Sequence, residues 1–194
     1  ILYGLLVGIP FIVINILTFD SLLHPYFLHS GINGRHFFEA LIGNLISPAR
    51  GLFVYSPIYV ISIFYFFKSK KKIEKNIIAI IVFFHWIIIS FFVIWWGGHT
   101  YGNRFFSDMT PFFIYFLILY LKDFSFSFKN SQLKHRLKIF VISALILISF
   151  YMHFKNVYFF TPWNQSPTNI DLNPKRLWDI TDPPFLRFNN NNRN

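Results

Sequence analysis

The sequence contains no cysteine and few charged residues. The 194 residues include 18 Lys and Arg against 8 Asp and Glu, so only 13% are charged. The lack of cysteine excludes disulfides and thiolate chemistry. Soluble domains typically carry about 25% charged residues, so the deficit excludes an ordinary soluble domain and indicates an integral membrane protein.

Long apolar runs take the place of the missing charges. A hydrocarbon core of about 30 Å needs about 20 helical residues. We therefore predict an all-α integral membrane fold of about five transmembrane helices, with the fourth extending as far as residue 128. The expected spans are Ile1–Phe19, Leu52–Phe67, Ile77–Trp96, Pro111–Leu121 and Ile139–Phe154.

Polar segments separate the spans. In residues 36–47, apolar side chains recur at helical spacing, which predicts a short interfacial helix in the first loop. Thr110-Pro111 is typical of a helix start, with Thr110 as the cap. We expect a membrane domain over 1–154, as the C-terminal part of a larger one, and a polar tail over 155–194.

The net charge of +10 indicates topology rather than nucleic-acid binding, because no nucleic-acid motif is present. Loops 68–75 and 122–138 hold ten of the 18 basic residues. By the positive-inside rule they are cytoplasmic, which places loops 20–51 and 97–110 and the tail on the outer face.

The polar loop of residues 95–111 is the main candidate site. Arg104 can bind a lipid phosphate through its two-pronged guanidinium, or it can bond ordinary lipid headgroups or backbone carbonyls. Asp108 fits a capping residue or an Arg104 partner better than a base. His99 and Tyr101 are candidates for lining the site. Arg50, in the preceding outer loop, is either a second phosphate ligand or an anchor for the second span.

The histidines do not have the spacing of a metal site. His85 lies within a predicted span, and we interpret it as a neutral side chain bonded to a neighbouring helix. His36 and Glu39 are interpreted as the solvated face of the interfacial helix.

Three motifs carry a resemblance to a known family. Residues 47–57 (SPARGLFVYSP), 95–111 (WWGGHTYGNRFFSDMTP) and 177–187 (LWDITDPPFLR) resemble conserved stretches of bacterial GT-C glycosyltransferases. That group includes relatives of protein mannosyltransferases and of the aminoarabinose transferase of lipid A. Asn103 stands where the family pattern more often has proline.

The resemblance implies an all-helical enzyme of the bacterial inner membrane. Such enzymes move a sugar from a polyprenyl-phosphate carrier to a glycan, lipid or protein acceptor on the outer face. Arg104 and Arg50 would then bind the donor phosphate, with Tyr101, His99 and Asp108 lining the site. The family's catalytic carboxylate belongs to an earlier outer loop, so no catalytic residue is assigned here. The cofactor is left unknown, since the sequence shows no metal site.

Two alternatives stay open. One is a non-catalytic transporter or assembly subunit, although a transporter would place polar residues at mid-membrane depth. The other is a polysaccharide polymerase or ligase that uses a lipid-pyrophosphate donor. An acidic residue in a short outer loop preceding this sequence would favour the glycosyltransferase.

Overall fold

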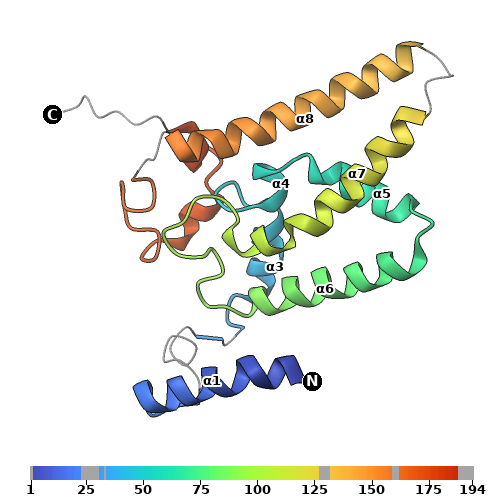
Figure 1. Cartoon of the computed structure of the whole chain (residues 1–194). Helices are drawn as coiled ribbons and strands as arrows, with labels where there is room; N and C mark the ends of the chain where they lie inside the picture. Colours follow the sequence, from blue (N-terminus) through green and yellow to red (C-terminus); the bar gives the residue numbers. More distant parts are fainter. Residues whose placement is uncertain (1, 23–30, 33, 127–131, 159–161, 188–194) are drawn as a thin grey trace.

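The computed structural model describes residues 2–22, 31–32, 34–126, 132–158 and 162–187 (Figure 1). Its regular structure within these ranges is helical, apart from one isolated bridge between Ile32 and Phe92. The α-helices are α1 (Leu2–Phe19), α3 (Phe37–Ile46), α4 (Leu52–Tyr55), α5 (Tyr59–Lys68), α6 (Lys72–Ser90), α7 (Thr110–Phe126) and α8 (Gln132–Tyr158). The 3-10 helices are η1 (Arg104–Met109), η2 (Pro174–Trp178) and η3 (Pro184–Leu186).

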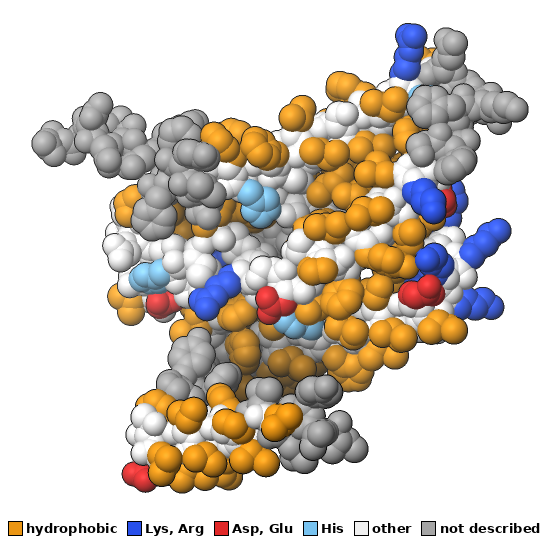
Figure 2. All heavy atoms as spheres, viewed as in Figure 1, with side chains coloured by type: hydrophobic (Ala, Val, Ile, Leu, Met, Phe, Trp, Pro, Cys, Tyr) orange, Lys and Arg blue, Asp and Glu red, His pale blue; other side chains and the backbone are white. Residues whose placement is uncertain are grey.

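Three helical segments are long and apolar enough to cross a membrane: Lys72–Ser90, Arg104–Phe124 and His135–Lys155. Their large apolar side chains remain widely exposed on the surface (Figure 2). Gly8–Phe19 and Tyr59–Lys68 are apolar but shorter. The all-helical class is therefore confirmed, whereas the count of five spans stays a prediction.

The prediction of one continuous helix over 52–67 is wrong, because α4 and α5 are separate helices. Ser56 lies between them with φ −133° and ψ 64°, outside the helical region. The cause is Pro57, which disfavours helical geometry in the residue before it. The short helix predicted in the first loop is present as α3.

The third and fourth predicted spans also have different ends. Helix α6 stops at Ser90. The chain after it pairs with the segment before α3, where the Val93 amide donates to Gly31 O at 2.9 Å. The predicted helix start at Thr110-Pro111 is confirmed, because α7 begins at Thr110. Thr110 is not its cap, however, because Thr110 is itself helical and follows η1 directly. Asn103 caps η1 by accepting the Phe106 amide at 3.1 Å.

Aromatic packing joins α5 to α7, which lie side by side along their length (Figure 1). The rings of Tyr59 and Phe113 stack with centroids 4.8 Å apart, and Phe66 meets Phe116 edge-on. A buried apolar cluster continues from these rings toward η1 through Phe106. The packing fixes the position of η1 and of the loop that precedes it.

The tail after α8 folds back onto the segments that precede α4 and η1. Its residues share a buried core, which we name the tryptophan cluster, with residues from α3 and from both loops. The members are Ala40, Ala49, Trp95, Trp96, Trp163, Ile170 and Leu177. Segments far apart in sequence therefore form one packed end of the molecule.

Candidate functional site

The three motifs that carry the family resemblance meet in space. Ser47 Oγ donates a hydrogen bond to Leu177 O at 2.6 Å, which joins the first motif to the third. Arg50 Nε donates to Trp96 O at 3.0 Å, which joins the first motif to the second. The site therefore has a framework built from all three sequence segments.

Arg50 lies at the centre of this framework and is 1% exposed. Besides Trp96 O, its guanidinium donates to Gly98 O at 3.3 Å and to Asn164 Oδ1 at 2.6 Å. Its Cζ also lies 5.4 Å from the centre of the Trp163 ring. Burial lowers the pKa of Arg50 to about 10, so the group stays charged at neutral pH. These contacts make Arg50 a crosslink between the 47–51 segment, the 95–98 segment and the tail.

Gly102 places the second motif against the first. Its φ is +66°, and an added Cβ would lie 3.1 Å from the Tyr55 ring. Glycine alone adopts this region without a steric cost, so a side chain here would move the loop. Asn103 then fixes the start of η1, because its Nδ2 donates to Asn44 O at 2.5 Å. The residue that departs from the family pattern thus has a structural role.

Arg104 is exposed at the first turn of η1. No hydrogen bond or ion pair engages its side chain within the described part of the chain. In a 3-10 helix, residues three apart eclipse, whereas residues four apart are rotated by about 120°. Arg104 therefore shares a face with Ser107 and not with Asp108, which is also exposed. The 3-10 geometry explains why the i, i+4 pair with Asp108 does not form.

His99 and Tyr101 face different surroundings. His99 Nε2 lies 3.1 Å from Asp171 Oδ2 and 3.2 Å from Asn169 Oδ1, so it contacts the tail. The Tyr101 ring packs edge-on against Tyr55 with centroids 5.1 Å apart. Burial raises the pKa of Tyr101 to about 12, so its hydroxyl is neutral and cannot serve as a base at pH 7.

A pocket of about 250 Å³ lies beside η1. Its lining combines apolar and aromatic side chains with the polar residues Ser56, Asn103, Ser107, Thr110 and His153. Ser56 Oγ and His153 Nε2 are 2.9 Å apart. Arg104 is not among the lining residues, although it is the neighbour of Asn103 in sequence.

Sequence reasoning did not single out Ser56 or His153. Ser56 lies inside the first motif, and His153 is an ionisable residue in an apolar helix, which is the available signal. The expectation for His85 is confirmed in its contact, since Nε2 lies 2.6 Å from Phe105 O. Glu39 is not simply solvated, because it accepts a hydrogen bond from Trp178 Nε1 at 3.0 Å.

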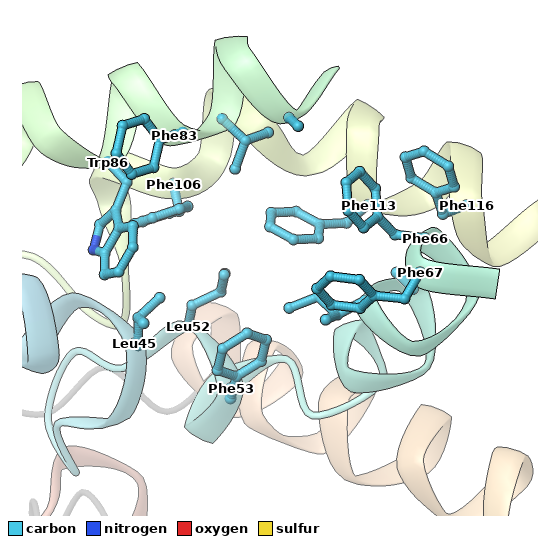
Figure 3. Close-up of a pocket in the computed structure, with 14 residues that line it drawn as sticks. Leu45, Leu52, Phe53, Phe66, Phe67, Phe83, Trp86, Phe106, Phe113 and Phe116 are labelled. Atoms are coloured by element: carbon cyan, nitrogen blue, oxygen red, sulfur yellow. The ribbon is translucent and has the colours of Figure 1, made fainter. Parts of the chain in front are cut away.

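An apolar groove of about 340 Å³ lies between α5, α6 and α7. Leu52 and Phe106 line both spaces. Figure 3 shows the groove as an open centre, with Phe83 and Trp86 on one side and Phe66 and Phe67 on the other. The combination suits an amphiphilic ligand whose apolar chain and polar head occupy adjoining spaces.

The described residues contain no group of three His, Asp or Glu side chains that could hold a metal ion. No protein-family model, curated protein or solved structure matches this chain. The functional reading therefore depends on the geometry of the site and on the sequence motifs.

Proposed function

We propose that this chain is part of a membrane glycosyltransferase that takes a sugar from a polyprenyl-phosphate carrier. The observation that carries the proposal is the pocket lined in part by Ser56, Asn103 and His153, which shares Leu52 and Phe106 with an apolar groove. Arg104 is exposed in η1, directly after Asn103. A lipid-linked sugar has the matching order of parts: an apolar chain, a phosphate and a polar sugar.

Each part of the site has a role in this proposal. The groove holds the first isoprene units, and Arg104 binds the phosphate. Arg50 keeps the loop of Arg104 in place through its bonds to Trp96 O and Gly98 O. The pocket with Ser56 and His153 receives the sugar.

The chemistry asked of this chain is electrostatic. When the glycosidic bond breaks, negative charge grows on the carrier phosphate, and a fixed guanidinium stabilises it. The carboxylate that deprotonates the acceptor belongs, by the family resemblance, to an earlier outer loop. The proposal places the site on the outer face of a bacterial inner membrane, opposite loops 68–75 and 122–138.

Arg104→Lys tests the phosphate assignment. Lysine keeps the charge but loses the two-pronged geometry, so transfer from a polyprenyl-phosphate sugar should fall by about 10- to 100-fold. Because Arg104 is exposed, the free energy of unfolding should change by less than about 0.5 kcal/mol. The measurements are transfer by the purified full-length protein and its thermal unfolding.

A charge-matched pair supplies the control. Arg104→Gln and Lys175→Gln each remove one exposed positive charge, the second from η2 in the tail. Only the first should reduce transfer. Full activity of Arg104→Gln, or an equal loss in both variants, would reject the assignment.

A further inference from the structure

A second pocket lies at the lysine-rich end of the helices, away from the candidate site. Its volume is about 400 Å³. Figure 2 shows Lys and Arg side chains gathered where the α5–α6 connection and the end of α7 lie in Figure 1. The pocket draws charged side chains from two separate segments: Lys68, Lys70 and Lys71 from the first, and Lys122 and Asp123 from the second.

The charge of this pocket suits an anion. Four lysines face one aspartate among its lining residues. Tyr65 donates a hydrogen bond to Asp123, so that carboxylate already has a partner from α5. The four lysines outnumber the one carboxylate, so the pocket carries a net positive charge that attracts a phosphate.

The start of α6 adds to the positive potential. The first amides of a helix lack partners within the helix and favour an anion nearby. Lys71 is the N-cap residue of α6, and its Nζ lies 3.7 Å from Glu74 Oε1 and 3.4 Å from the Tyr115 hydroxyl. Glu74 therefore offsets part of the charge of Lys71, and Lys68, Lys70 and Lys122 supply the remaining positive charge of the pocket.

The surroundings favour a lipid over a free ion. Leu119 lines the pocket, and the neighbouring Phe67 is 74% exposed beside Lys68. An acyl chain can cover such apolar side chains while the headgroup phosphate contacts the lysines. We propose that this pocket binds the phosphate of an anionic phospholipid on the face opposite the candidate site.

The test uses the purified protein in nanodiscs and native mass spectrometry, with phosphatidylglycerol and phosphatidylcholine as probes. The double variant Lys68→Gln/Lys122→Gln should bind phosphatidylglycerol about tenfold more weakly. The control Arg136→Gln/Lys138→Gln removes the same charge from α8, outside the pocket, and should bind as before. An equal loss in both variants would overturn the proposal, because it would indicate general surface attraction.

A gain of binding separates the effect from misfolding. Asp123→Asn keeps an oxygen that accepts the Tyr65 bond but removes the negative charge, so affinity for phosphatidylglycerol should rise about threefold. Unchanged affinity would overturn the proposal. Inorganic phosphate is the competing probe: if it displaces phosphatidylglycerol and binds as tightly, the site takes free phosphate and the lipid assignment fails.

Discussion

Arg50→Ala is expected to lower the free energy of unfolding by about 3–5 kcal/mol. The side chain is 1% exposed, and it donates to carbonyl oxygens of the 95–98 segment and to Asn164 of the tail. Its loss leaves these buried acceptors without a donor and opens a space against Trp163. The 47–51 segment, the 95–98 segment and the tail should therefore separate before the long apolar helices unfold.

The measurement is denaturation in mixed micelles, followed by tryptophan fluorescence because Trp95, Trp96 and Trp163 are buried in the tryptophan cluster. Arg50→Lys should also destabilise, since one ammonium group cannot reach all the acceptors that the planar guanidinium reaches. Arg104→Ala is the matched control, because Arg104 is exposed and should change stability by less than about 0.5 kcal/mol. Equal stability of the Arg50 and Arg104 variants would contradict the role of Arg50 as a crosslink.

Gly43→Ala is expected to destabilise the protein by about 2 kcal/mol, although alanine favours helix over glycine by about 1 kcal/mol. Gly43 lies in α3 against the face of Trp95, and an added Cβ would stand 2.2 Å from Trp95 Cη2. Trp95 is 1% exposed, so its rigid ring has no open space into which it can turn. Relief of the clash requires α3 to move away from the tryptophan cluster.

Gly8→Ala is the control for this substitution. Gly8 lies in α1, where an added Cβ meets nothing within 4 Å. The same change should therefore leave stability equal or raise it by up to about 1 kcal/mol. The measurement is the free energy of unfolding of both variants. If Gly43→Ala were stabilising, α3 would not pack on Trp95 as described.

Much of the helical structure followed from the sequence, because apolar period and length are local properties. For example, Lys72–Ser90 and His135–Lys155 are long and apolar enough to cross a membrane. Errors arose where a local signal competed with another. Pro57 divided the expected second helix, and Asn103 rather than Thr110 capped the helical path into α7.

The candidate site was only partly predictable. The exposure of Arg104 agrees with its placement in a polar, glycine-rich loop. The role of Arg50 was left open between a phosphate ligand and an anchor for the second span, because its burial depends on contacts with the distant tail. Ser56 and His153 come together at 2.9 Å from segments 97 residues apart, and no local pattern predicts such a contact.

By itself, the sequence determined the helical class, the apolar spans, the charge asymmetry between the loops and the motifs worth comparing. These depend on composition and on spacing along the chain. Only the tertiary structure decided that the three motifs share one framework, that Arg50 is inside it, and that Ser56 and His153 line a pocket next to an apolar groove. The reason is physical: burial, cavities and long-range hydrogen bonds depend on which distant segments pack together, and that packing has no local signature.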